Sequence, residues 1–486
     1  MRQDNSVNLN SLLLFGIVSF ILIFIVCTNA PLDPDMWWHL KAGQTMWQQK
    51  LILTHDQFSF TKINQPWVNA FWISDLLIYL IFFLGGLRLL IIGIAFLAAI
   101  IFFLIYSRSS GPFFIRSLVI LLAGISLSPE WTVRPQVFSF FLLALLNLWM
   151  EKRKLNRTPP LYFLPIFFIF WANIHGGYIW GFLLLSATMV GLLLDNWTQK
   201  TVDKKNNIIE LKQLAIWSSI SILTTLINPN GLAIWRLPFK TIAVSISAIQ
   251  EWSSPNFHRF EMQPFLWMVF LLIIGYSLSG KKASFTDILK SVGFIYLAFV
   301  SQRNIPIAIL VITPIVIDQF TEIWQNLKNT LIRPSTTTPS WNQRFHGSMV
   351  INFLIVIFLI IAAFGRTYLQ TSPSLIEKEY PLKAIRSIQL THPKVNMFNS
   401  YNWGGYLIWS LPEYPVFIDG RADLFGESLI NEWWDVVNGT DKAMAILDKY
   451  HINFIILEPD WPIINILKNN QWNITYQDNI SIVLTR

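Results

Sequence analysis

Long apolar runs recur between residues 12 and 364, and they constrain the fold more than any other feature of the sequence. Each run is long enough, or nearly so, for a helix that crosses the hydrocarbon core of a bilayer. The runs are Leu12–Val26, Leu87–Tyr106, Phe113–Ser128, Val137–Met150, Leu161–Trp171, Tyr178–Leu194, Leu214–Ile227, Phe265–Leu278, Phe285–Val300, Ile305–Ile317 and Met349–Phe364. Hydropathy alone therefore predicts about eleven membrane-spanning helices.

The composition agrees with a membrane protein and excludes several other classes. Hydrophobic residues make up 53% of the chain and charged residues 13%, which is too little charge to cover a water-exposed surface of this size. The net charge of +8 comes from short basic segments between apolar runs, so it indicates membrane topology rather than nucleic-acid binding. Cys27 is the single cysteine, which excludes an intramolecular disulfide and a thiolate metal cluster.

Two segments decide the topology. Leu12–Val26 is compatible with a cleaved signal peptide or a retained helix, and its length favours the helix. Ala70–Leu84 is apolar but short, and it carries polar residues near its start. If it spanned, the basic clusters at 152–157 and 200–212 would lie outside, against the positive-inside rule. We therefore expect Ala70–Leu84 to lie in the interface or dip partway into it, with the N-terminus cytoplasmic.

This topology predicts which segments lie on the extracytoplasmic side. They are 30–86, 129–136, 172–177, 228–264, 301–304 and 365–486. These segments hold nearly all the unusual polar residues of the chain. We therefore expect any active site to lie at this membrane surface.

The last part of the sequence changes character, because its apolar runs shorten to a length that suits strands. The predicted strands are Lys394–Phe398, Val416–Ile418, Asn453–Leu457, Trp472–Tyr476 and Ile480–Leu484. The predicted helices are Trp403–Ser410, Leu429–Val437, Lys442–Tyr450 and Ile463–Lys468. We therefore expect an α-helical polytopic membrane domain over 1–368, with interfacial helices in its first outer loop (30–86), and a small extracytoplasmic α/β domain over 369–486.

The densest polar cluster follows the first apolar run, in Pro31-Leu-Asp-Pro-Asp-Met-Trp-Trp-His39. Asp33 and Asp35 supply two carboxylates, one of which could act as a general base while the other positions a partner. Trp37 and Trp38 offer a stacking or interfacial surface, and His39 adds a second titratable group. The alternative is a loop of interfacial aromatic residues whose solvated carboxylates only cap the next helix.

Two arginines lie in very short outer turns, where the positive-inside rule makes them unexpected. They are Arg134 in Trp131-Thr-Val-Arg-Pro-Gln136 and Arg303 in Gln302-Arg-Asn-Ile-Pro306. A guanidinium suits the oxygens of a lipid phosphate. The alternatives are snorkelling toward headgroups, or pairing with Glu130 or Asp35.

Other outer turns hold further candidates. His175 precedes two glycines, and Glu251 lies in Glu251-Trp-Ser-Ser-Pro255; ordinary turn chemistry is the alternative for both. Asp419 and Arg421 follow a predicted strand, at the end where α/β sheets place ligand sites. No Walker A, HExxH or GxSxG motif is present, so an ATP-driven pump is not expected.

The architecture and the first-loop acidic motif, Asp33-Pro34-Asp35, resemble the polytopic glycosyltransferases of the GT-C fold. The segments Asn399 to Gly405 and Phe417-Ile-Asp-Gly-Arg-Ala-Asp423 are similar to the tail of uncharacterised bacterial members. Pro34 separates the two aspartates, unlike the adjacent Asp-Glu pair typical of the mannosyltransferase branch. The oligosaccharyltransferase motif WWDYG is absent; Trp433-Trp434-Asp435 continues as Val-Val, and we interpret it as a chance match.

The resemblance implies an inverting transfer of a sugar from a polyprenyl-phosphate donor to an acceptor of unknown class, in a bacterial plasma membrane. Asp33 or Asp35 would be the base, Arg134 and Arg303 would stabilise the departing lipid phosphate, and His39 and His175 would orient it. A divalent metal is compatible with the site but not required. The alternatives are a lipid or solute transporter or flippase, and a non-catalytic membrane assembly protein.

Overall fold

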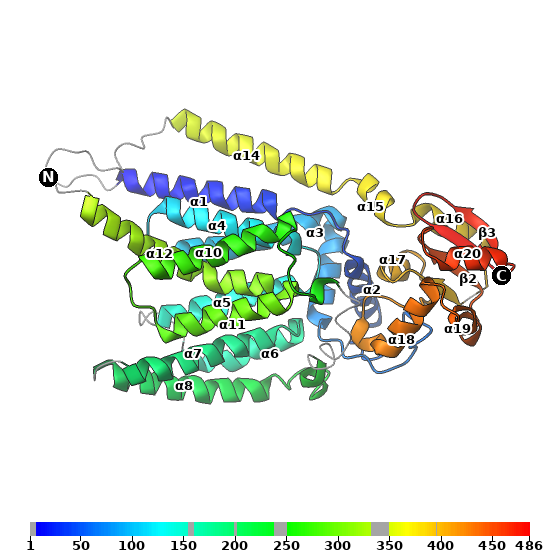
Figure 1. Cartoon of the computed structure of the whole chain (residues 1–486), viewed down its shortest axis with the longest axis horizontal. Coiled ribbons are helices and arrows are strands. Elements are labelled where there is room, and N and C mark those ends of the chain that lie inside the picture. The colour runs from blue at the N-terminus through cyan, green and yellow to red at the C-terminus, as the bar shows by residue number, and fades with distance from the viewer. Residues whose placement is uncertain (1–5, 154–159, 199–201, 238–249, 332–348, 395) are drawn as a thin grey trace.

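Helices make up most of the chain in the computed structural model, which describes residues 6–153, 160–198, 202–237, 250–331, 349–394 and 396–486. An elongated bundle of roughly parallel helices carries a smaller domain at one end (Figure 1). The bundle helices are α1 (Ser6–Val26), α3 (Trp72–Arg108), α4 (Phe113–Leu127), α5 (Gln136–Arg153), α6 (Leu164–Ile174), α7 (Tyr178–Thr198), α8 (Val202–Thr224), α10 (Gln263–Leu278), α11 (Phe285–Val300), α12 (Ile305–Leu331) and α14 (Met349–Gln370). Each predicted apolar run coincides with one of them.

The bundle has the surface of a protein surrounded by lipid. Within the described residues, six helices are long and apolar enough to cross a membrane. Large apolar side chains remain exposed on their outer faces, such as Phe103 on α3 (49% exposed) and Phe364 on α14 (74% exposed). Water would not solvate such a surface, so the chain is a multi-pass membrane protein. The total of about eleven crossings stays a prediction.

Helix α3 is broken near its middle, at two glycines. Gly85 and Gly86 have non-helical backbone angles, and Gly86 has a φ of 63° that favours glycine. The first half, before the break, runs across the end of the bundle, whereas the second half runs along it (Figure 1). The expected interfacial position of Ala70–Leu84 agrees with this geometry. Helix α2 (Pro34–Gln49) packs beside this first half.

The C-terminal region contains a small sheet covered by short helices. Its helices are α15 (Pro373–Glu379), α16 (Leu382–Thr391), α17 (Gly404–Ser410), α18 (Ala422–Val437), α19 (Ala443–Lys449) and α20 (Ile463–Asn469). Its strands are β1 (Met397–Asn399), β2 (Phe454–Leu457), β3 (Asn473–Gln477) and β4 (Ile482–Thr485). They lie in the order β1-β2-β4-β3, with β1 parallel to β2 and the other two pairs antiparallel. The expected α/β character is confirmed; the boundary after residue 368 stays a prediction.

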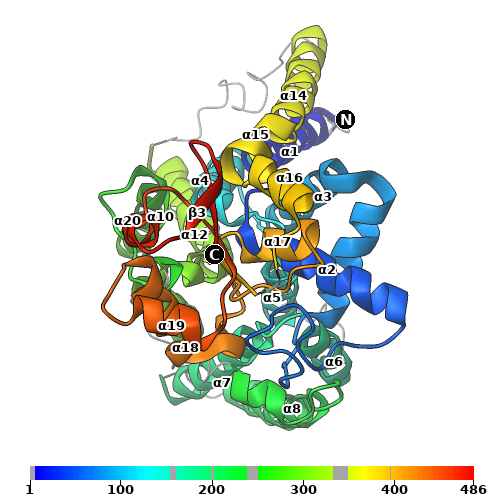
Figure 2. The same ribbon diagram turned by 90° about the vertical axis from the view of Figure 1, so that its right-hand side faces the viewer.

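The prediction of a sheet strand at Val416–Ile418 is wrong, because this segment pairs with the first outer loop. The Val416 amide donates to the Phe58 carbonyl at 3.1 Å, and the Phe60 amide donates to the Val416 carbonyl at 3.1 Å. The Thr61 hydroxyl donates to the Phe417 carbonyl at 2.6 Å. The backbone of this segment is thus satisfied by a loop far away in sequence, and the loop and the C-terminal domain form one layer over the bundle end (Figure 2).

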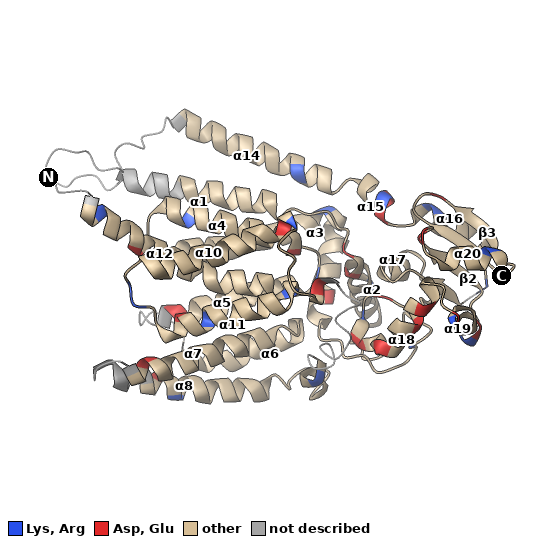
Figure 3. Cartoon of the chain, viewed as in Figure 1, with Lys and Arg blue, Asp and Glu red and all other residues tan. Residues whose placement is uncertain are grey.

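Charged residues are sparse along the bundle and gather near its ends and in the C-terminal layer (Figure 3). The described parts of the six segments expected outside lie at the bundle end that carries the C-terminal domain (Figure 1). Parts of the basic clusters at 152–157 and 200–212, expected in the cytoplasm, lie outside the described residues.

Candidate active site

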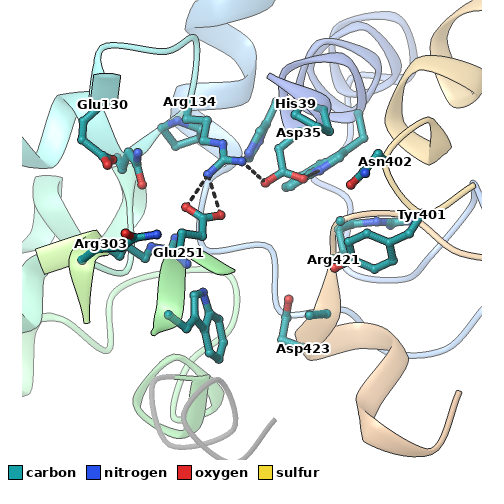
Figure 4. A pocket seen from close by; sticks show the side chains of 18 of the residues that line it. Asp35, His39, Glu130, Arg134, Glu251, Arg303, Tyr401, Asn402, Arg421 and Asp423 are labelled. Atoms are coloured by element: carbon teal, nitrogen blue, oxygen red, sulfur yellow. Dashed lines mark hydrogen bonds and ion pairs between the residues drawn. The ribbon is translucent and has the colours of Figure 1, made fainter. Parts of the chain in front are cut away.

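A cavity of about 690 Å³ lies between α2, the short outer turns of the bundle and the C-terminal domain. Figure 4 shows charged side chains from these three sources converging on it. The predicted site residues that line the cavity are Asp35, Trp38, His39, Arg134, His175, Glu251, Arg303 and Arg421. The predicted residues that do not line it are Asp33, Trp37 and Asp419. The structure therefore brings together most of the residues chosen from the sequence.

The start of α2 fixes the two aspartates. Asp33 is the N-cap residue, and its Oδ1 accepts a hydrogen bond from the Asp35 amide at 2.9 Å. Pro34 takes the first helical position, where its missing N–H costs nothing. Asp35 then lies in the first turn, and its Oδ1 accepts a hydrogen bond from Trp38 Nε1 at 3.0 Å. Asp33 therefore caps α2, which is part of the alternative interpretation that the carboxylates of this segment cap the next helix.

Arg134 lies among three carboxylates. Its Nε lies 2.6 Å from Asp33 Oδ2, and its Nη2 lies 3.2 Å from Asp35 Oδ2. Its Nη1 donates to both carboxylate oxygens of Glu251, at 3.1 Å each. Glu251 belongs to the short helix η4 (Gln250–Trp252), in the turn region that follows α8. The arginine is therefore paired with Asp35, as one alternative expected, and with two further acidic residues.

The carboxylates around Arg134 differ in basicity. Burial raises the pKa of Asp35 to about 6, and Asp33 and Glu251 also raise it, against the lowering effects of Arg134 and the Trp38 hydrogen bond. For Glu251, burial acts to raise the pKa, but Arg134 and Arg303 outweigh it and the pKa is lowered. Burial also raises the pKa of Glu130, which lines the same cavity, to about 7. Asp35 and Glu130 are thus both suited to accept a proton near neutral pH, and Asp35 is the one that contacts Arg134.

His39 and His175 are both buried beside the cavity. Nδ1 of His39 lies 2.6 Å from Oδ1 of Asp75, which is on the first half of α3. Nδ1 of His175 lies 2.8 Å from the Ser139 hydroxyl and accepts from the Gly177 amide at 2.9 Å. Burial lowers the pKa of His39 well below its usual range, and that of His175 to about 3. Both imidazoles are therefore neutral at physiological pH.

Arg303 is the cavity cation with the greatest freedom to bind an anion. It lies in the short helix η6 (Gln302–Asn304) and lines the cavity near Glu251. Among the described residues, no hydrogen bond or ion pair within bonding distance holds its guanidinium. Its donors are thus available to a ligand, whereas those of Arg134 contact carboxylates.

Three predicted binding residues instead hold the C-terminal domain against α2. Trp37 is buried and packs edge-on against Tyr406 and Tyr380, with ring centroids 4.8 and 5.8 Å apart. Arg421 is buried between Asp419 and Asp56, each 2.6 Å away. A direct ligand role for Trp37 and Asp419 is therefore not supported by the geometry, and Arg421, although it lines the cavity, has its donors engaged.

The cavity also has an aromatic wall that the sequence interpretation missed. Trp433 and Trp434 of α18 line it together with Trp461 and Tyr401. The rings of Trp433, Trp434 and Trp461 pack edge-to-face, with centroids 5.1 to 5.9 Å apart. The Trp433-Trp434 pair, interpreted as a chance motif match, thus faces the site. The sequence signal that could have indicated this aromatic wall is the pair of adjacent tryptophans that follows the Asp419-Gly-Arg421 turn.

Within the described part of the chain, no three or more His, Cys, Asp or Glu side chains are grouped so that they could hold a metal ion. The carboxylates of Asp33, Asp35 and Glu251 contact Arg134 instead. Metal dependence stays an untested prediction.

The fold is similar to those of solved membrane proteins. No protein-family model matches the sequence, and no curated protein is significantly similar to it. The archaeal oligosaccharyltransferase AglB from Archaeoglobus fulgidus, in complex with an inhibitory peptide and a dolichol-phosphate, superposes with a TM-score of 0.55 at 10% identity, covering 93% of this chain and 69% of that one. Its apo form gives a TM-score of 0.58 at 9% identity over 92% and 69%. ArnT from Cupriavidus metallidurans in the apo state gives 0.51 at 13% identity over 99% and 98%. The chain therefore has the expected GT-C fold.

Proposed function

We propose that this chain is a membrane glycosyltransferase that takes a sugar from a polyprenyl-phosphate donor and transfers it to an acceptor in the cavity. One observation supports this most directly. Asp35, whose pKa is about 6, lies beside Arg134 in a cavity that opens where the bundle meets the C-terminal domain. AglB, which has a similar fold, was solved with a dolichol-phosphate bound.

In the proposed reaction, Asp35 is the general base. A hydroxyl or amine of the acceptor attacks the anomeric carbon of the donor sugar from the face opposite the phosphate. Its proton passes to Asp35 as the new glycosidic bond forms and the bond between the anomeric carbon and the phosphate oxygen breaks. The polyprenyl phosphate leaves with the electron pair, and the anomeric configuration inverts.

Arg303 is the residue that we assign to the departing phosphate. Negative charge grows on the leaving oxygen as the glycosidic bond breaks, and a positioned guanidinium lowers the energy of that state. Arg134 has the complementary task of holding Asp33, Asp35 and Glu251 in place, since its donors already contact them. His39 and His175 are neutral and can orient the donor by hydrogen bonding without adding charge.

The acceptor belongs on the side of the cavity formed by the C-terminal domain. Trp433, Trp434 and Trp461 provide flat apolar surfaces there, which suit a sugar ring or an aromatic or aliphatic group of an acceptor. We place the cavity on the extracytoplasmic face of a bacterial plasma membrane, with the N-terminus in the cytoplasm. The positive-inside rule supports this orientation.

The test is a transfer assay in membranes or detergent with radiolabelled polyprenyl-phosphate sugars as donors. We expect the wild type to release polyprenyl phosphate, and Asp35→Asn to lose about two to four orders of magnitude of the rate, the usual contribution of a general base. Asp441→Asn is the matched control, because Asp441 is exposed and does not line the cavity. Full activity of Asp35→Asn would contradict the assignment of the base.

A further inference from the structure

A glycine of the C-terminal domain lies directly against the carboxylate of Asp35. A Cβ atom built on Gly420 would lie 1.8 Å from Asp35 Oδ1 and 3.0 Å from its Cγ, and no other residue supplies any of the three nearest atoms. Gly420 does not have a positive φ, so its backbone conformation does not require glycine. What requires glycine here is the space that the Asp35 carboxylate occupies.

The turn that carries Gly420 is held on both sides. The Arg421 amide and Nε donate to Asp419 Oδ1 at 3.0 and 2.8 Å, and the Arg421 Nη1 donates to Asp56 Oδ1 at 2.6 Å. All three side chains are buried. Because Asp56 belongs to the first outer loop, this ion triad joins the turn to the part of the chain that follows α2. The turn is therefore a rigid wall that cannot retreat from Asp35.

Side chains outside this turn also hold the Asp35 carboxylate. Trp38 Nε1 donates to Oδ1, and Arg134 Nη2 contacts Oδ2 at 3.2 Å. A second glycine, Gly405, touches the preceding residue: a Cβ there would lie 2.3 Å from the Pro34 carbonyl oxygen. The C-terminal domain thus contacts both the Asp35 side chain and the backbone that leads into it.

We propose that Gly420 is a positioning residue for Asp35, so that the C-terminal domain forms one wall of the catalytic site and sets the direction of the base. This inference rests on the proposed role of Asp35. Without a side chain at 420, the carboxylate stays between the turn and Arg134. A methyl group at 420 would push the carboxylate away from Trp38 and the turn, and the oxygen that accepts the proton would leave its productive position.

Thermal unfolding of the detergent-solubilised full chain tests the contact without any need for activity. Four proteins are compared in a double-mutant cycle: wild type, Gly420→Ala, Asp35→Ala and the double variant. We expect Gly420→Ala to lower the Tm clearly in the wild-type background and hardly at all in the Asp35→Ala background, where the obstructing carboxylate is gone. Equal losses in both backgrounds would overturn the inference.

Gly404→Ala is the matched control from the same domain. Its Cβ would meet the Ile418 carbonyl oxygen at 2.3 Å, and this backbone contact does not involve Asp35. Its effect on the Tm should be the same in both backgrounds. If the Gly420→Ala protein does not accumulate in cells, adding Asp35→Ala should restore its accumulation. If the double variant does not accumulate either, the inference is overturned.

The transfer assay then separates this inference from the proposed function. We expect Gly420→Ala to lower kcat by about a hundredfold, the cost of misplacing a catalytic group by about 1 Å, with little change in the donor KM. A fully active Gly420→Ala beside an inactive Asp35→Asn would refute the positioning role and leave the proposed function intact. If the Tm effects of Gly420→Ala and Asp35→Ala depend on each other but the wild-type protein transfers no sugar, the contact between the two residues is supported and the proposed function is refuted.

Discussion

Nδ1 of His39 lies 2.6 Å from Oδ1 of Asp75, so a buried pair joins α2 to the first half of α3, which precedes the break in that helix. Asn69 Nδ2 donates to the other Asp75 oxygen at 3.4 Å. The carboxylate thereby fixes the orientation of the imidazole that lines the cavity. We therefore expect Asp75 to be a positioning residue for His39, a contact that no local sequence pattern indicated.

We expect Asp75→Asn to lower the transfer rate by about tenfold or more, because an amide can stabilise the wrong tautomer of His39. His39→Ala should lower it as well, and the double variant should be no slower than the worse single variant, since both changes remove the same function. The measurement is kcat for the four proteins. Additive losses would show that Asp75 does not act through His39.

The rate should depend on pH through Asp35. The base works in its ionised form, and burial raises its pKa to about 6 in the free protein, so kcat/KM should rise as pH increases through about 6 and level off above it. Trp38→Phe removes a hydrogen bond that lowers this pKa, so the midpoint should move to higher pH. Glu251→Gln removes a charge that raises it, so the midpoint should move to lower pH. Shifts in the same direction for both variants would contradict this assignment.

Loss of Arg303 should weaken the binding of polyprenyl phosphate, the group that leaves the donor. A charge-assisted hydrogen bond contributes about 1.5 to 3 kcal/mol, so Arg303→Gln should weaken the binding of a polyprenyl phosphate by roughly ten- to a hundredfold. Arg303→Lys should retain part of the affinity because it keeps the charge. Equilibrium binding of a fluorescent polyprenyl phosphate is the measurement. Arg386→Gln, an exposed site on α16, is the control and should bind normally.

Removal of Arg421 should destabilise the joint between the first loop and the C-terminal domain. Arg421→Gln would leave Asp56 and Asp419 buried without their partner, which costs about 3 to 5 kcal/mol. Thermal unfolding in detergent should show a large drop in Tm. Arg486→Gln breaks an exposed ion pair with Asp448 and a contact over the Trp472 ring, and should change the Tm far less.

The proposed orientation predicts the pattern of cysteine labelling from each side of the membrane. In a Cys27→Ala background, Gln65→Cys and Asn470→Cys should react with a membrane-impermeant maleimide in intact cells. Lys328→Cys, at the far end of α12, should react only after permeabilisation. All three positions are exposed. Labelling of Lys328→Cys in intact cells would reverse the topology.

The sequence predicted correctly those features of the fold that depend on residues close together in the chain. Apolar runs identified the bundle helices, and the expected change to strands after the last run is confirmed by β1 to β4. The Asp33-Pro34-Asp35 segment predicted two functional carboxylates, with helix capping as the alternative. The structure shows that Asp33 caps α2 and that both carboxylates contact Arg134. Charge alone left Arg134 ambiguous, because a lipid phosphate and a carboxylate satisfy a guanidinium equally well.

Contacts between distant segments could not be predicted. Asp56 and Arg421 are separated by most of the chain, and neither has a neighbour in sequence that indicates the ion pair. Val416–Ile418 has the composition of a sheet strand, yet its backbone groups bond to the first loop. Residues such as Asp75 and Gly420 matter through what faces them in space, and a single sequence carries no record of those neighbours.

The joint between the first part of the chain and the C-terminal domain has a practical consequence for chimaeras, because side chains such as Asp56 and Arg421, and Trp37 and Tyr406, meet across it. Grafting the tail of a homologue onto this bundle would exchange one partner of the joint and keep the other. The segment from the start of α2 at Pro34 through residue 71 and the tail must therefore be transplanted as one cassette. By the same logic, side chains that meet across the joint, such as Asp56 and Arg421, should vary together among natural variants.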